Sequence, residues 1–136
     1  MRITSNPWET SIEKRLHNEM VLQRKNQRMT KIKKIRVCPD FHSSGLWDHR
    51  GYMIEFKTLR LPPALIRQIE DWIEYYDRKC HTKEYSFIKN RAKKLNKMGL
   101  EIALKIKELY PKIPVTYMGE FEEEKNIIKG PKRIHP

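Results

Sequence analysis

Two cysteines and three histidines are the side chains of this sequence that most readily do chemistry. Cys38 and His42 are separated by three residues, His49 follows them, and Cys80 and His81 are adjacent. Thiolate and imidazole ligands in two pairs would suit tetrahedral zinc. Neither spacing matches a zinc motif, and adjacent residues rarely both reach one metal ion. The sequence therefore predicts ordinary reduced cysteines and surface histidines, with no metal site and no cofactor.

The same thiols, and the hydroxyls of Ser43 and Ser44, are the candidate nucleophiles. None of them stands in a Gly-x-Ser-x-Gly elbow or in another motif that would activate it. Glu70 and Glu74 lie one helical turn apart, a spacing more typical of a solvated helix face than of an acid–base pair. The five glycines form no phosphate-binding loop. We therefore predict no catalytic residues and a protein that is not an enzyme.

Positive charge is the feature that points to a partner. The chain of 136 residues carries 29 Lys and Arg against 17 Asp and Glu, a net charge of +12. We predict two basic clusters as partner-binding surfaces, one in an N-terminal arm and one on a long helix: Arg24, Lys25 and Arg28, and Lys89, Arg91, Lys93, Lys94 and Lys97. Such clusters suit a polyanion or an acidic protein surface. A solvated basic surface without a partner is the alternative.

Two tryptophans have different predicted roles. Trp47 stands beside a predicted four-residue turn, Asp48–Gly51, and an exposed Trp there would be a good contact for a partner. Trp72 falls on an apolar stripe and is predicted to be a core anchor.

Hydrophobic spacing predicts the elements that position these residues. Alternation predicts strands at about residues 34–37 and at residues 46–47, 52–56 and 115–118, the middle two forming a hairpin. A helix should follow Pro62 and Pro63, with Leu65, Ile69, Trp72, Ile73 and Tyr76 on its apolar face. A longer helix is predicted at residues 86–110. Its seam contains Gly99, which we expect to allow close approach to the facing helix beside Trp72.

These elements predict an α+β fold. It has a small antiparallel or mixed sheet of about four strands, covered on one face by two helices, with an extra N-terminal helix. Residues 1–31 form a basic N-terminal helix or arm, residues 32–119 a single α+β domain, and residues 120–136 a charged, loosely ordered tail. The sequence has no apolar run of the roughly 20 residues that a membrane helix needs. We therefore expect a cytoplasmic protein that does not bind a membrane.

Residues 37–119 carry a recognisable layout of short motifs. These are Pro39-Asp40, Leu46-Trp47-Asp48, Leu61-Pro62, Trp72, Tyr76-Asp77, Gly99 and Val115-Thr116-Tyr117. The layout resembles that of small bacterial proteins of uncharacterised function, some of which look like immunity proteins of toxin systems.

The resemblance implies a non-catalytic immunity or inhibitor protein that neutralises a cognate bacterial toxin by direct protein–protein contact. Because this chain is basic, its toxin would carry an acidic face. The alternative is a nucleic-acid-binding protein that uses the N-terminal arm and the basic face of the long helix.

Overall fold

The computed structural model describes residues 31–128. The unit that begins at Ile32 contains every helix and strand described below. The predicted N-terminal helix lies outside the described residues, as do Arg24, Lys25 and Arg28.

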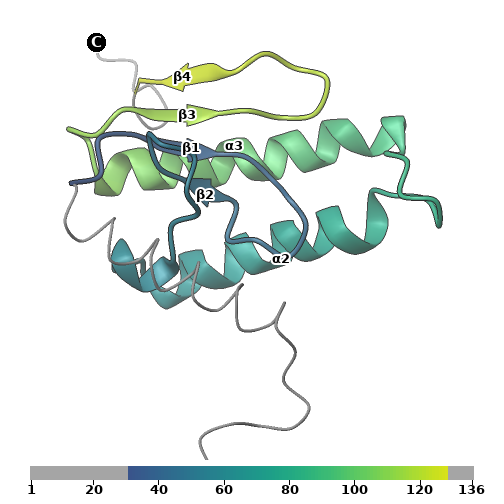
Figure 1. The fold of residues 1–136 in the computed structure, drawn as a ribbon, viewed down its shortest axis with the longest axis horizontal. Coiled ribbons are helices and arrows are strands. Elements are labelled where there is room, and N and C mark those ends of the chain that lie inside the picture. Colours follow the sequence, from purple (N-terminus) through teal and green to yellow (C-terminus); the bar gives the residue numbers. More distant parts are fainter. Residues whose placement is uncertain (1–30, 129–136) are drawn as a thin grey trace, which may run out of the picture. The chain divides into compact units, whose positions relative to one another are not determined.

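Four short strands form one mixed sheet (Figure 1). They are β1 (Ile35–Val37), β2 (Leu46–Trp47), β3 (Val115–Tyr117) and β4 (Lys125–Ile127), in the spatial order β2-β1-β3-β4. β1 pairs in parallel with β3, and the two outer strands pair antiparallel with their neighbours. The predicted α+β class is confirmed, and of the two kinds of sheet left open, antiparallel or mixed, the structure has the mixed one.

Two long helices complete the fold. α2 (Pro63–Lys79) begins at the predicted prolines, and α3 (Ala92–Leu109) runs beside it. α3 contacts β1, β3 and β4, so it is the helix that lies against the sheet. Single turns of 3-10 helix, η1 (Phe56–Thr58) and η2 (Lys89–Arg91), lead towards the two helices.

The core lies where the helices meet the sheet. Ile35 and Val37 of β1 are fully buried, as are Tyr117 of β3 and Trp72 of α2. The rings of Trp72 and Tyr117 have centroids 6.4 Å apart, and the Trp72 indole N–H donates to the carbonyl of Leu95 at 3.1 Å. Trp72 is therefore the core anchor that its place on the apolar stripe predicted.

The long helix begins six residues later than predicted. Ile88 has extended backbone angles (φ −86°, ψ 104°), and its N–H donates to the carbonyl of Cys80 at 2.7 Å. This hydrogen bond joins the two ends of the loop that follows α2. The backbone before Lys89 therefore forms a loop and not a helix. The second arm of the predicted hairpin is also shorter, because only Met53 bridges to Trp47 and Phe56 belongs to η1.

Gly99 approaches a strand, whereas we expected the facing helix. A Cβ atom built on Gly99 would lie 2.3 Å from Cε1 of Tyr117. The aromatic ring on β3 therefore occupies the space that the missing side chain leaves on α3.

The last strand lies in a segment to which the sequence assigned no strand. Residues 125–127 form β4, and Ile127 pairs with Val115 and is buried. Only one of the three residues is buried, so β4 has no hydrophobic alternation that sequence could detect.

Candidate protein-binding surface

The sheet face turned away from α3 carries Trp47, one of the predicted contact residues. Arg36 pairs with both Trp47 and Thr116 in register, so these three residues form a row across β2, β1 and β3. Trp47 is only half-buried, and its indole N–H donates to the carbonyl of Cys38 at 2.9 Å. Its ring is thus held in place and borders a pocket of about 190 Å³ with Arg36 and Met118.

An ion-pair cluster lies on the same face, towards the β4 edge of the sheet. Glu124 accepts two hydrogen bonds from the Arg36 guanidinium, each 3.2 Å long, and pairs with Lys34 at 3.0 Å. The adjacent Thr116 hydroxyl, and after it the two cations, lower the pKa of Glu124 to about 2. The carboxylate therefore stays charged and ties the segment before β4 to β1 across β3.

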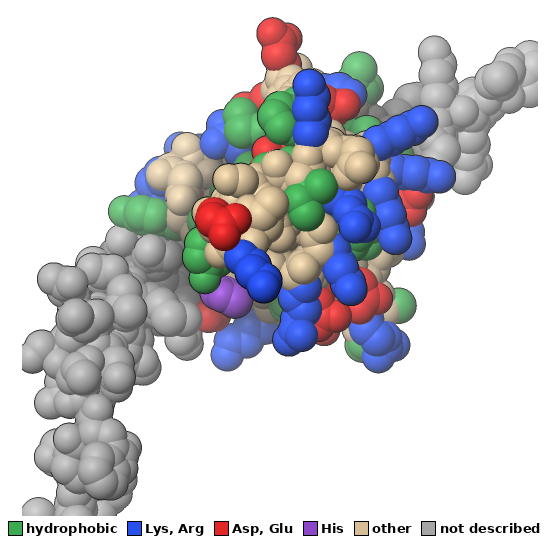
Figure 2. Space-filling view, turned by 90° about the vertical axis from the view of Figure 1, so that its right-hand side faces the viewer, with side chains coloured by type: hydrophobic (Ala, Val, Ile, Leu, Met, Phe, Trp, Pro, Cys, Tyr) green, Lys and Arg blue, Asp and Glu red, His purple; other side chains and the backbone are tan. Residues whose placement is uncertain are grey.

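The predicted basic residues of the long helix are exposed and lie at its start. They are Lys89, Arg91, Lys93, Lys94 and Lys97, on η2 and the first turns of α3. Lys94 lies 4.8 Å from the ring centroid of Tyr75, so part of its side chain packs on α2. Seen from the end at which α2 connects to α3, Lys and Arg side chains gather on one side of the molecule (Figure 2). Trp47 is on another element, an edge strand.

Aromatic side chains from three loops meet beside this basic region. We call them the aromatic end: Phe41 from the β1–β2 loop (residues 38–45), His81, Tyr85 and Phe87 from the α2–α3 loop (residues 80–88), and Phe121 from the β3–β4 loop (residues 118–124). Their rings form a continuous series. Centroid distances are 6.2 Å for Tyr85–Phe41, 4.5 Å for Phe41–His81, 5.4 Å for His81–Phe87 and 5.6 Å for Phe87–Phe121.

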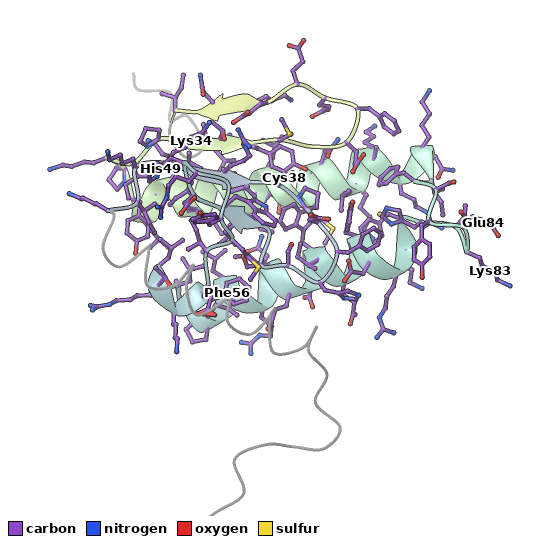
Figure 3. The ribbon with its side chains drawn as sticks, viewed as in Figure 1. Lys34, Cys38, His49, Phe56, Lys83 and Glu84 are labelled. Atoms are coloured by element: carbon purple, nitrogen blue, oxygen red, sulfur yellow. The ribbon has the colours of Figure 1, made fainter. Side chains whose placement is uncertain are left out.

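Much of the aromatic end is open to solvent. Tyr85 is 78% exposed, Phe121 65% and Phe41 36%. Lys83 and Glu84 stand at the tip of the same α2–α3 loop and point away from the molecule (Figure 3). Exposed rings of this size cost free energy in water, which is why contiguous exposed apolar patches often mark binding sites.

The sequence did not predict the aromatic end. Its members come from three separate segments of the chain, so no local pattern joins all of them. The only local signal was a bulky aromatic at Tyr85 and Phe121 within segments that otherwise read as turns.

The nucleophile candidates lie in environments that hold them neutral or engage them in the fold. Burial raises the pKa of Cys38 and that of Cys80 to about 11, so both thiols are protonated at neutral pH. The hydroxyls of Ser43 and Ser44 donate to the backbone carbonyls of Asp40 and Ile54, at 2.8 and 2.7 Å.

Within residues 31–128, no group of three or more His, Cys, Asp or Glu is placed to hold a metal ion. In the same part of the chain, neither helix combines the length and the apolar character that a membrane span requires.

Comparison with known proteins gives one result. Residues 33–120 match a family model described as Serratia CdiI immunity protein-like, so the chain belongs to that family. The matched range includes β1 to β3 and both helices and ends before β4. No curated protein and no solved structure matches significantly.

Proposed function

We propose that this member of the Serratia CdiI immunity protein-like family neutralises a cognate bacterial toxin by binding it directly, without catalysis. The family match over residues 33–120 is the observation that carries the proposal. The two protonated thiols support the non-catalytic part, because a cysteine nucleophile needs a lowered thiol pKa.

The test is protection of growing cells. The reading frame next to the gene for this chain is expressed in a sensitive host, alone and together with the full chain. We expect the neighbouring product to stop growth and the full chain to restore it, and the two purified proteins to co-elute. Failure of the full chain both to restore growth and to bind the neighbouring product would contradict the proposal.

We further propose that the toxin presents acidic groups to the start of α3. The five exposed basic side chains of η2 and α3 support this, because opposite charges steer association and fix the orientation of two proteins. Reversing four of them together, in Lys89→Glu, Arg91→Glu, Lys93→Glu and Lys94→Glu, should slow association with the toxin at low salt. Reversal of four exposed residues elsewhere (Lys57, Arg60, Arg67 and Lys112) is the matched control.

Nucleic-acid binding is the second candidate function, and the same exposed basic side chains favour it. A mobility-shift titration of random-sequence RNA and duplex DNA across salt tests it. Binding that weakens steeply with salt and disappears in the fourfold charge-reversed variant would support it. The absence of any shift at low salt would exclude it.

A further inference from the structure

We infer that the aromatic end is the surface that binds the toxin, with the rings of Tyr85 and Phe121 entering an apolar recess on the toxin. The inference rests on the function proposed above and names the surface through which that function acts. Three features of the aromatic end support it: the backbone of the three loops, the side chains under the rings and the charges around them.

The backbone of these loops is held in an unfavourable conformation. Four non-glycine residues in the described part of the chain have left-handed backbone angles, and three of them belong to the three loops. These are His42 (φ 51°), Tyr85 (φ 64°) and Phe121 (φ 59°). A bulky residue in this region destabilises the folded backbone, and glycine or asparagine would relieve the strain. Such strain at exposed aromatic residues is typical of binding sites.

Hydrogen bonds within the α2–α3 loop hold the backbone of Tyr85 in place. The N–H of Tyr85 donates to the carbonyl of Thr82 at 2.9 Å, and Thr82 and Ser86 are joined by a backbone bond of the same length. His81 and Phe87 then bridge as an antiparallel pair below this turn. Because the loop backbone is already ordered, little backbone entropy remains to be lost when a partner buries Tyr85.

A helix side chain holds the loop that carries Phe121. Asn96 of α3 donates to the carbonyl of Glu120 and accepts from its N–H, both at 3.0 Å. Phe121 follows directly and packs edge-on against Phe87, with ring planes at 79°. Both exposed rings are therefore supported from below, as the anchors of a protein interface are.

Charges of both signs border the rings, which favours a folded protein over a nucleic acid. Arg91 and Lys94 lie near enough to Cys80 to lower its thiol pKa, although burial, the larger effect, raises it. Phe121 is preceded by Glu120 and followed by Glu122 and Glu123, and Glu120 lies near enough to Cys80 to raise its thiol pKa. These carboxylates would repel phosphates over the aromatic end, whereas a protein surface can match both signs.

The test uses the full chain and the purified toxin product of the neighbouring reading frame. The double variant Tyr85→Asn with Phe121→Asn removes both rings, and asparagine tolerates the left-handed backbone. We expect affinity for the toxin to fall at least 100-fold, protection to be lost, and the unfolding midpoint to stay the same or rise. Tyr85→Phe should retain most of the affinity.

Leu109→Asn is the matched control, because Leu109 is 46% exposed at the opposite end of α3, about 25 Å away. It should change affinity by less than threefold. If the wild-type chain binds and the double variant binds within threefold of it, the inference is wrong while the proposed function stands. If the double variant loses RNA or DNA binding instead of toxin binding, the inference is also wrong.

Discussion

The side-chain amide of Asn96 pairs with both backbone groups of Glu120, 24 residues further along the chain. Its Nδ2 donates to the Glu120 carbonyl and its Oδ1 accepts from the Glu120 N–H, both at 3.0 Å. The same Oδ1 accepts the Tyr117 hydroxyl at 2.8 Å. A Cβ at Gly119 would lie 2.2 Å from this oxygen, so glycine is what lets the amide come so near. One buried amide thus joins α3 to the end of β3.

Asn96→Ala should be costly for this reason. Three hydrogen bonds disappear, and the buried Tyr117 hydroxyl loses its partner. We expect the free energy of unfolding in urea to fall by about 2–4 kcal/mol. Gln68→Ala is the control, because the Gln68 amide accepts from Lys105 at the exposed surface, and its removal should cost under about 0.5 kcal/mol. Equal losses in the two variants would contradict this account of Asn96.

Gly99→Ala should destabilise the protein although it improves helix propensity. Alanine in a helix interior is favoured over glycine by about 1 kcal/mol. The added Cβ, however, would lie 2.3 Å from Cε1 and 2.7 Å from the hydroxyl oxygen of Tyr117. We expect a net loss of about 1–3 kcal/mol in urea denaturation.

A double-mutant cycle separates this clash from other effects of the alanine. Tyr117→Leu removes the ring, so adding Gly99→Ala to it should cost much less than Gly99→Ala alone. Additive losses would show that the ring is not what excludes a side chain at position 99.

Hydrophobic periodicity predicted those elements in which several residues at regular spacing are buried. α2 buries Leu65, Ile69, Trp72, Ile73 and Tyr76, the five residues that its spacing predicted. β1 buries both of its alternate positions, Ile35 and Val37. β4 was missed because its pairing with β3, and not its own composition, makes it a strand.

The candidate surface was less predictable than the fold. The exposure of Lys93, Lys94 and Lys97 could be predicted from charge and helix spacing, since both are local. Lys89 and Arg91 are exposed too, but they belong to η2 and not to the predicted helix. Gly99 signalled a close approach, but a glycine does not say which element approaches it. The aromatic end depends on three loops whose rings meet only after the sheet and both helices have formed. No spacing rule connects residues 41, 85 and 121.

Glu124 should give stability a specific dependence on pH. Its pKa is lowered from 4.5 to about 2 in the folded chain. A lowered carboxyl pKa stabilises the folded state above pH 4.5, and this contribution is lost as pH falls towards 2. Glu124→Gln should therefore lower the free energy of unfolding by about 1–2 kcal/mol at pH 7, a modest value because its partners are partly solvated.

At pH 2 the Glu124→Gln variant and the wild-type chain should differ little. Glu123→Gln is the control, since Glu123 is exposed and precedes Glu124 directly. It should have little effect at either pH. A difference between Glu124→Gln and wild type that does not change from pH 7 to pH 2 would rule out the carboxylate as its source.

The two thiols should react slowly in the folded chain. Burial raises both pKa values from 9.0 to about 11, so at pH 8 the reactive thiolate is about 100-fold scarcer than in the unfolded chain. Labelling with an aromatic disulfide reagent should therefore be at least 100-fold slower in buffer than in concentrated urea. Cys80→Ser leaves Cys38 alone and Cys38→Ser leaves Cys80, so the two rates can be separated. Cys80, which is fully buried, should be the slower of the two. If Cys38 reacted in the folded chain as fast as in urea, burial would not be raising its thiol pKa, and the pKa of Cys38 would no longer support a function without catalysis.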